Sequence, residues 1–422
     1  MPDTDSRITR AADGTVLVAD TPGVHGAAFT RAVLDVAGAV LVRSVLDAPG
    51  PPTAQIHDPG QAQQWLWAVY GERVAAAVHA CAVGGSQSVL VPPERTALAG
   101  SAARLALGHW AARWWPTSYL DGTPGLEPDV LGLELAALTH QCQQLSDTVG
   151  DSWDQDSAAD LLTEHQAGLD PLIEWWRAAP PATGTADRLE GVLRLIDDAA
   201  DSTGQDGPAL RRLRISLDQR RHQRHQSGTQ VDLGALFARN GDYALAAGDR
   251  TAAGGRVIAR GSGTNDWQRY PPGYVDAADT AVSWAVRAVG ARRQIEVDAV
   301  TVVGAPAGAS LTAEVRVDGG PVQRIPLGRQ DDRWSGAAVL ELAAAALSPR
   351  IEVGVLLPGF DPGPEGGDGP GEVLRDAAAR DAVRALVRRR LAVAAQPDLP
   401  CDASGEPFLA EIAAAATTVE DF

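Results

Sequence analysis

Two His-x-Cys patterns in the N-terminal part of the chain combine the residue types that bind zinc. They are His79-Ala80-Cys81 and His140-Gln141-Cys142, and two histidines with two cysteines can form a tetrahedral zinc site. The spacing opposes a site on either pair, because residues i and i+2 of a helix point to nearly opposite sides. We therefore predict no metal and no cofactor, and His79, Cys81, His140 and Cys142 are the candidates if a metal site exists.

Hydrolytic motifs are missing from the sequence. No Gly-x-Ser-x-Gly elbow occurs, and Glu164-His165 lacks the second histidine of an HExxH motif. A nucleophilic Cys81 or Cys142 acting with a distant histidine stays open. One alternative function is therefore a peptide-modifying enzyme or maturation factor that uses Cys/His chemistry or zinc in the N-terminal half, and the sequence does not decide whether the chain is an enzyme.

The one dense basic patch consists of arginines that follow Pro208, which is placed to open a helix. Its arginines are Arg211, Arg212, Arg214, Arg220, Arg221 and Arg224. Such a patch can bind phosphate or nucleic acid, but the chain has a net charge of −18 and the patch has no interleaved aromatics. We expect these arginines to pair with acidic protein surface, and nucleic-acid binding through Arg211–Arg224 is a further alternative.

A second candidate for recognition is the aromatic, proline-stiffened segment 267–274, with the sequence WQRYPPGY. It precedes the β-rich part of the chain, and we expect Trp267, Arg269, Tyr270 and Tyr274 to bind a partner. Covering a sheet edge is the alternative role of this segment.

All 36 basic residues are arginine. The absence of lysine excludes Schiff-base chemistry and a P-loop lysine. The segment 17–23, LVADTPG, resembles the switch region of translation-factor GTPases, but no P-loop precedes it; we interpret it as a strand and a turn. The single Met and two Asn indicate a GC-rich genome as the source of the bias.

The composition is that of a folded multidomain protein, with 422 residues, 45% of them hydrophobic and 21% charged. Three cysteines give no disulfide framework and fit a reducing compartment. The N-terminus lacks the apolar region of a signal peptide, and no apolar run is long enough to span a membrane. We expect a cytoplasmic protein that does not bind membranes.

The periodicity predicts a mainly helical N-terminal half. Residues 1–148 should form a mostly helical, or small α/β, domain, in which 27–45 is a helix or a helix followed by a strand and 61–82 is one helix. Residues 151–226 should add three helices, with a break at Pro171.

After about residue 240 the apolar pattern changes to alternation, with strands expected at 294–302, 311–317, 322–327, 334–340 and 350–357. We therefore predict an antiparallel β-sandwich at about 236–358. A Pro/Gly linker at 359–371 and a C-terminal helical tail at 372–422 complete an α+β multidomain fold.

The missing catalytic motifs and the modular layout favour a non-enzymatic cytoplasmic adaptor or binding protein. It would recognise a protein or peptide partner, as an accessory component of a multi-gene pathway. Arginine supports this interpretation, because its planar guanidinium pairs with carboxylates and stacks on tryptophan.

Overall fold

The structure of the chain is a computed structural model. The structure describes residues 5–19, 27–47, 51–84, 88–145 without 93 and 95, 158–179, 183–222, 236, 256–340 without 272, 291, 303–304, 306–307 and 309, 349–360, 370–396 and 405–420. Its contacts divide the chain into two compact units. The mixed unit comprises Met1–Ala112, Leu126–Phe237 and Asp376–Phe422, and the β unit comprises Arg113–Gly125 and Ala238–Arg375.

The mixed unit contains a six-stranded antiparallel sheet in the order β3-β4-β5-β2-β1-β6. Its strands are β1 (Ser6–Arg10), β2 (Val16–Ala19), β3 (Arg31–Val36), β4 (Ala39–Ser44), β5 (Thr53–Ile56) and β6 (Ser88–Val91). Each strand of the β1–β2 hairpin alternates buried and more exposed residues, as expected when one face of a sheet is covered.

The expectation of a helix within residues 27–45 is wrong. A short 3-10 helix, η1 (Ala28–Thr30), is followed directly by the β3–β4 hairpin. The turn contains Gly38 at φ +70°, where a Cβ would lie 2.4 Å from the carbonyl oxygen of Asp58. The buried residues Ala32, Leu34 and Val36 alternate with the period of a strand. The high alanine and leucine content of the segment favoured the prediction of a helix instead.

Two helices, α1 (Pro59–Tyr70) and α2 (Glu72–Ala82), pack together, and α2 contacts β1, β2 and β6. The Asp58 carboxylate caps α1 by accepting from the backbone N–H groups of Gly60 and Gln61. Gly71 at φ +88° separates the two helices, so the single helix predicted for 61–82 is instead two.

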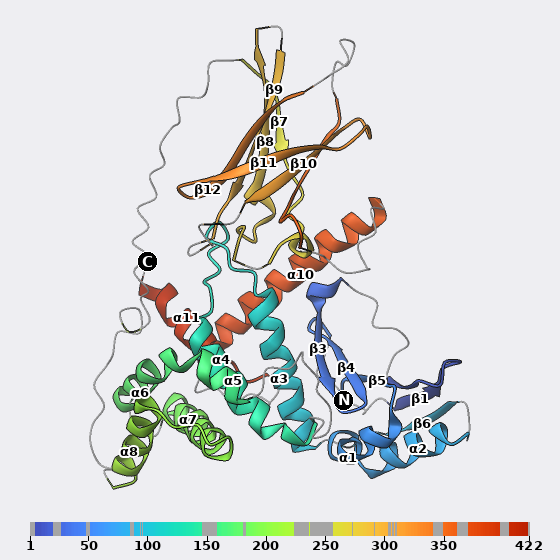
Figure 1. Cartoon of the computed structure of the whole chain (residues 1–422), viewed down its shortest axis with the longest axis vertical. Helices are drawn as coiled ribbons and strands as arrows, with labels where there is room; N and C mark the ends of the chain where they lie inside the picture. The colour runs from blue at the N-terminus through green and yellow to red at the C-terminus, as the bar shows by residue number, and fades with distance from the viewer. Residues whose placement is uncertain are drawn as a thin grey trace. The chain divides into compact units, whose positions relative to one another are not determined.

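The remaining helices of the mixed unit include α4, whose residues Val130–Leu138 are buried without interruption, and several of the others pack against it. They are α3 (Ala97–Trp114, of which 113–114 belong to the β unit), α4 (Pro128–Gln141), α5 (Ala158–Glu164), α6 (Leu169–Ala178), α7 (Gly184–Ser202), α8 (Pro208–His222), α10 (Pro370–Ala394, in this unit from 376) and α11 (Leu409–Glu420), with the 3-10 turns η2 (Gln143–Leu145) and η3 (Gln166–Gly168) (Figure 1). A helix that is apolar all round must be central. None of the described helices is both long and apolar enough to cross a bilayer.

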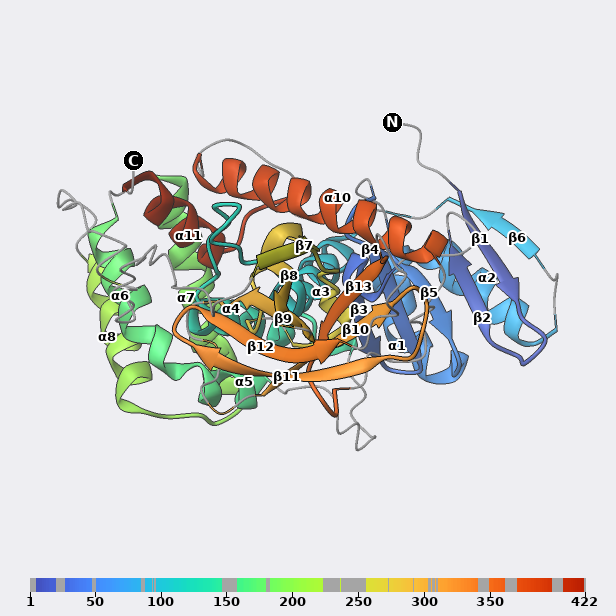
Figure 2. The ribbon, with the colours of Figure 1, turned by 90° about the horizontal axis from the view of Figure 1, so that it is seen from above.

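The β unit is built on one antiparallel sheet in the order β13-β10-β11-β12-β9-β8-β7. Its strands are β7 (Arg256–Ser262), β8 (Val282–Val289), β9 (Arg292–Val300), β10 (Leu311–Val317), β11 (Gln323–Gln330), β12 (Arg333–Leu340) and β13 (Ile351–Leu356). The curvature of β11 and β12 is plain in Figure 2. The sheet curls until Thr264, just after β7, pairs with Gly354 of β13.

The alternating pattern therefore predicted β9 to β13 correctly, but β7 and β8 were missed. The turn between β10 and β11 contains Asp318 and Gly319, both with positive φ, 50° and 71°, as is typical of tight hairpin turns. The mixed α+β class is thus confirmed, and the sandwich arrangement stays a prediction.

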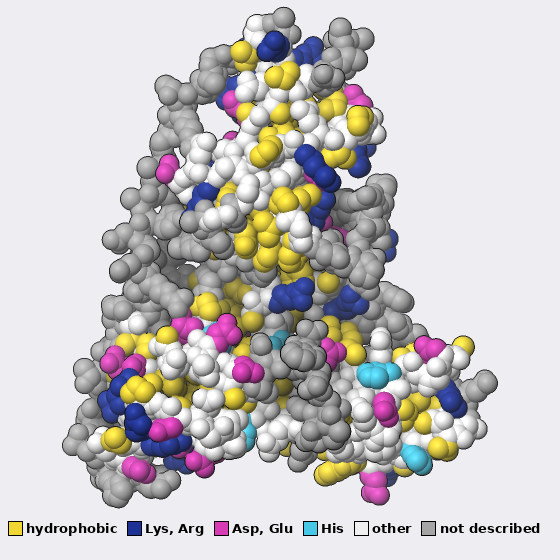
Figure 3. Space-filling view, viewed as in Figure 1, with side chains coloured by type: hydrophobic (Ala, Val, Ile, Leu, Met, Phe, Trp, Pro, Cys, Tyr) yellow, Lys and Arg dark blue, Asp and Glu magenta, His cyan; other side chains and the backbone are white. Residues whose placement is uncertain are grey.

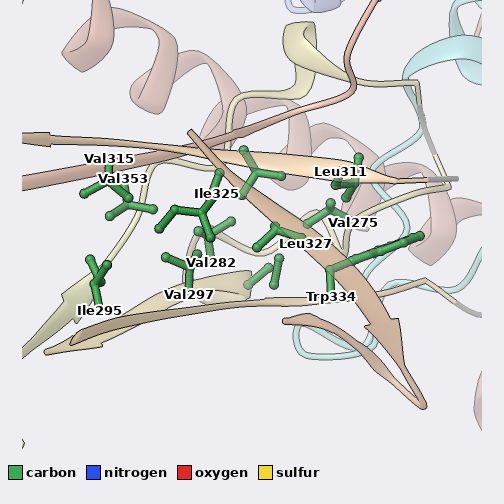
Figure 4. Packing of buried hydrophobic residues seen from close by; sticks show 14 of the residues in the cluster. Val275, Val282, Ile295, Val297, Leu311, Val315, Ile325, Leu327, Trp334 and Val353 are labelled. Carbon is green, nitrogen blue, oxygen red and sulfur yellow. The ribbon is translucent and has the colours of Figure 1, made fainter. Parts of the chain in front are cut away.

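The core of the β unit lies inside the curl of the sheet. Val315 and Val353 face Ile295 and Val297 across it, and Trp334 closes one end (Figure 4). The Trp334 Nε1 donates to the carbonyl oxygen of Tyr274 at 2.9 Å, which satisfies the one polar atom of this buried indole.

Candidate functional site

The candidate site is formed by two segments of the β unit that meet outside its sheet. The first is residues 113–125, which connect the end of α3 to the chain that enters α4. Ser118 and Thr123 pair as a two-way bridge, with N–H···O distances of 2.9 and 2.7 Å. Gly122 at φ +65° allows the tight turn between them, and Trp115 Nε1 donates to the Pro124 carbonyl at 2.9 Å, closing the base of the turn.

The second segment is residues 264–278, which run from β7 to the 3-10 helix η5 (Asp279–Ala281) that precedes β8. It opens with η4 (Trp267–Arg269), capped by Asp266. The buried Asn265 holds the segment together, because its Nδ2 donates to the carbonyls of Asp276 and Ala278 at 2.8 and 2.6 Å. Its Oδ1 accepts from the hydroxyl of Tyr270.

Asp276 joins the two segments. Its carboxylate accepts from Ser118 Oγ and from Tyr119 N, each at 2.7 Å, and the backbone N–H of Ala277 donates to Thr117 O at 3.1 Å. A buried carboxylate is costly unless it is hydrogen-bonded, and this one is bonded at both oxygens.

Between the segments lies a cavity of about 30 Å³, which we call the aromatic cavity. It is lined by Arg113, Trp114, Trp115, Pro116, Thr117, Trp267, Tyr270, Gly273, Val275 and Ala277. Its walls are mainly aromatic and apolar, and the Arg113 guanidinium lies 5.1 Å from the centre of the Trp114 ring. A space of this size holds a water molecule or one small apolar group, which is far less than a cofactor needs.

The four residues predicted to bind a partner lie in different surroundings. Trp267 and Tyr270 are 6% and 3% exposed and line the aromatic cavity. Arg269 is not a free cation, because it pairs with Glu314 of β10 at 2.7 Å. Tyr274 packs against the sheet core. The structure therefore brings only Trp267 and Tyr270 together at the aromatic cavity.

The Glu314 carboxylate also accepts from Arg324, at 3.1 Å. Although partial burial opposes it, pairing with Arg269 and Arg324 lowers the pKa of Glu314. Arg269 is therefore paired within the β unit and shares the Glu314 carboxylate with Arg324.

The arginines of the basic patch whose side chains the structure describes are each paired with an aspartate. Arg211 pairs with Asp206 at 3.0 Å, Arg212 with Asp170 at 2.9 Å and Arg214 with Asp197 at 2.7 Å. Figure 3 shows arginine and acidic side chains interspersed over this corner of the mixed unit, near α6 and α8. The side chains of Arg220, Arg221 and Arg224 lie outside the described residues.

The His-x-Cys pairs are split by burial, as their spacing predicts. Cys81 is buried while His79 is exposed, and Cys142 is buried while His140 is half-buried. His140 Nδ1 lies 3.3 Å from Ser202 Oγ. Within the described residues, no three His, Cys, Asp or Glu side chains gather closely enough to hold a metal ion. Burial raises the pKa of the Cys142 thiol to about 12, so at neutral pH it is not a nucleophile.

A second cluster of polar groups, which the sequence patterns did not predict, lies inside the mixed unit. We call it the charged cluster; it comprises Arg104, Glu134, Arg188, Arg390, Glu406 and Glu411, with the ring of Phe408 among them. Arg104 bridges Glu134 at 3.0 Å and Glu406 at 2.6 Å. Arg188 donates to the other oxygen of Glu406 at 2.8 Å.

The charged cluster holds the start of α11. Glu134 Oε2 accepts from Leu409 N at 2.6 Å, and Glu411 Oε2 accepts from Phe408 N at 2.7 Å. These two carboxylates satisfy backbone donors at a helix N-terminus, which have no partner within the helix. Burial raises the pKa of Glu134 to about 7, and the nearby Arg104 opposes this shift.

A signal for the charged cluster was present in the sequence. Glu134 and Glu411 each stand alone among apolar residues, in LGLELAAL and FLAEIAAAA. Charged residues are almost never fully buried unless they are paired, so each predicts an internal partner. The arginines that serve as partners are not identifiable from spacing.

Comparisons of this chain with protein-family models, with curated proteins and with solved structures give no match.

Proposed function

We propose that this chain is a non-enzymatic, cytoplasmic adaptor that binds a protein or peptide partner through the aromatic cavity of its β unit. The observation that carries the proposal is the cavity itself. Two tryptophans and a proline from residues 113–117 face Trp267 and Tyr270 across a space that fits one small side chain. Aromatic walls around such a space are typical of the anchor pockets of protein interfaces.

The scaffold around the cavity supports recognition. The curled sheet packs its β10–β13 side against its β8–β9 side. The cavity lies in segments outside the sheet, where binding residues are common. Asn265 and Asp276 fix both segments by hydrogen bonds. Fixed walls reduce the entropy that a binding site loses when its ligand enters.

The two alternatives receive less support. The raised pKa of Cys142 opposes Cys/His chemistry at that residue, and the described arginines of α8 are paired with aspartates. A protein or peptide in the same multi-gene pathway is therefore the partner that we propose, and neither membrane nor nucleic acid.

The test is selection of a displayed random-peptide library on the full-length protein, followed by titration of the selected peptides. We expect them to share a small apolar anchor residue and to bind at least about tenfold more weakly, or about 1.4 kcal/mol, to Ala277→Leu, which fills the cavity. Trp267→Phe should weaken binding as well. The control is Trp67→Ala, because Trp67 is an exposed tryptophan on α1 of the mixed unit.

Selected peptides that bind Ala277→Leu as tightly as the wild-type chain would overturn the proposal. So would a selection that enriches no peptide. Melting curves of both cavity variants establish that each is folded before it is titrated.

A further inference from the structure

Strand β7 is an edge strand of the β unit, and its outer side is open. In the part of the chain that the structure describes, β7 pairs with β8 alone, and the other edge strand, β13, meets the chain only past the end of β7, at the Thr264–Gly354 bridge. Gly263 N donates to Val282 O of β8 at 2.9 Å. Successive residues of an antiparallel strand direct their backbone groups alternately toward and away from the neighbouring strand. Arg260 is three residues before Gly263, so its N–H and C=O face the open edge.

Two β-branched side chains are exposed on this strand. Val257 is 42% exposed and Ile258 is 46% exposed, and they lie where the pairing of β7 with β8 shifts register. Single exposed apolar residues are ordinary on a protein surface. Here two of them coincide with an open strand edge, and such an edge is a template for pairing with another extended chain.

Four arginines around this edge have no ion pair with any residue that the structure describes. They are Arg256 and Arg260 of β7 and Arg292 and Arg293 of β9. Arg256 lies opposite Ala288 of β8, and Ala288 lies opposite Arg293. Residues directly opposite each other in a sheet point to the same face, so these two arginines flank one alanine on one face.

The local charge on this side of the sheet is positive, although the whole chain is acidic. Strands β7, β8 and β9 together carry five arginines and two acidic residues. Both acidic residues already have partners, because Glu296 pairs with Arg287 at 2.8 Å and Asp298 accepts from Ser335 Oγ at 2.6 Å. A ligand that balances the charge of this edge must therefore supply carboxylates or other anionic groups.

We propose that β7 binds an extended acidic segment of a partner protein, which adds as a further strand to the open edge. The backbone groups of Arg260 pair with the backbone of the segment, as in other cases of strand addition. Apolar side chains of the segment pack on Val257 and Ile258, and its carboxylates pair with Arg256 and Arg260. None of these residues lines the aromatic cavity, so the inference does not depend on the proposed function.

Other occupants match this edge less well. A second copy of the chain offers β7 or β13 as its edge. Pairing β7 with β7 places arginines near arginines, which destabilises cross-strand pairing, and the one acidic residue of β13, Glu352, already pairs with Arg350 at 3.0 Å. Nucleic acid or an anionic membrane can contact the arginines, but neither forms a strand that pairs with the backbone of the edge.

The test is selection on the full-length protein of a displayed peptide library in which every second residue is acidic and the others are random. A library with arginine in place of the acidic residues is the control, and we expect enrichment from the acidic library alone. Each enriched peptide is then synthesised with N-methyl groups on one or the other alternate set of backbone nitrogens. A strand on one edge donates through every second residue. One set should therefore weaken binding at least about tenfold through lost hydrogen bonds, while the other set binds like the unmodified peptide.

Substitutions in the protein provide a second readout. Arg256→Glu/Arg260→Glu should weaken binding at least about tenfold, because it reverses the charge that the peptide meets, and added salt should weaken binding to the wild-type chain. Arg333→Gln is the control, because Arg333 is an exposed arginine of β12, which is paired on both sides. Unchanged binding by Ala277→Leu separates this interaction from the aromatic cavity, so that either proposal can fail alone.

Several results would overturn the inference. One is a selection that enriches no acidic peptide, including one after which an oligonucleotide or anionic vesicles bind through the same arginines. Another is a peptide that both N-methylated sets affect equally, and a third is equal binding by the charge-reversed and wild-type chains. A dimer of the chain that the charge reversal dissociates would assign the edge to a second copy instead. Both substituted arginines are exposed, and a melting temperature near that of the wild type shows that the variant is folded.

Discussion

Arg390 of α10 donates both Nε and one terminal nitrogen to the two carboxylate oxygens of Glu411 of α11, at 2.6 and 2.7 Å. Glu411 is completely buried, and its Oε2 also accepts from Phe408 N. The guanidinium of Arg390 lies 5.7 Å from the centre of the Phe408 ring, and that of Arg104 lies 5.0 Å from it. One buried ion pair therefore fixes the start of α11 and the ring beside it.

Removing one member of this pair should destabilise the mixed unit. Arg390→Ala leaves a buried carboxylate without its counter-charge, which costs about 3–5 kcal/mol, measured by urea unfolding. Arg389→Ala is the matched control, because Arg389 is exposed on the same helix and its loss should change stability by at most about 0.5 kcal/mol. Equal losses in the two variants would contradict the role of the pair.

Two glycines of α3 should respond in opposite directions to alanine. A Cβ at Gly108 would lie 2.5 Å from Leu135 and 3.2 Å from Phe408, while a Cβ at Gly100 meets nothing within 4 Å. Gly108→Ala should therefore cost about 1–3 kcal/mol. Gly100→Ala should stabilise by up to about 1 kcal/mol through helix propensity. Thermal melts of the two variants measure these changes in stability. A stabilising Gly108→Ala would contradict the prediction, because it would show that α3 and α4 can move apart at no cost in free energy.

The raised pKa of Glu134 predicts a pH dependence of stability. In the folded chain Glu134 has a pKa of about 7, whereas an exposed glutamate carboxyl has a pKa of 4.5. Between these values the folded state binds more protons, so the free energy of unfolding should fall as pH rises from 4.5 to 7. The loss should be roughly 1–3 kcal/mol and should level off above pH 7.

The measurement is chemical denaturation at several pH values for the wild-type chain and for Glu134→Gln. The glutamine does not titrate, so the difference in stability between the two proteins should change across this window. A constant difference would show that Glu134 has an ordinary pKa.

Asp276 should control the order of the 118–123 turn. Asp276→Ala removes the acceptor of Ser118 Oγ and of the backbone donors of Tyr119 and Leu120. The buried Ser118 hydroxyl, left without this partner, costs about 1–3 kcal/mol. We expect amide hydrogen exchange at Tyr119 and Leu120 to accelerate at least about tenfold. Asp279→Asn, at an exposed aspartate of η5, should leave that exchange unchanged.

The Cys142 thiol should be inert in the folded protein. Its pKa is raised to about 12 by burial, so little thiolate forms at pH 8. Peptide mapping after iodoacetamide treatment should find Cys142 unmodified in the native protein and alkylated in denaturant. Rapid native alkylation would restore the alternative of an enzyme that uses this cysteine.

Strands β9 to β13 were predicted from sequence because their apolar residues alternate along one buried face. Alternation at Leu311, Ala313 and Val315 predicted β10, because successive side chains of a strand point to opposite faces. Residues 27–45 do not show this alternation clearly, because apolar residues also occupy many of the positions between the buried ones. The prediction also missed β7, whose Val257 and Ile258 are exposed and therefore leave no buried-face pattern.

Partner binding by Trp267, Arg269, Tyr270 and Tyr274 stays a prediction. The sequence singled out Trp267 and Tyr270, and both line the aromatic cavity. The opposite wall comes from Trp114, the last residue of α3, and from Trp115. The sequence contained no indication that this helix continues into a segment that packs on the β unit.

By itself, the sequence determined the alternating strands β9 to β13 and the absence of amine chemistry. Only the tertiary structure decided which groups meet. Ser118 and Asp276 are 158 residues apart, and Glu134 and Leu409 are 275 apart. Periodicity reports which side of an element is buried, because it reflects local geometry. The partner on that side is selected by the packing of the whole core, which no local pattern encodes.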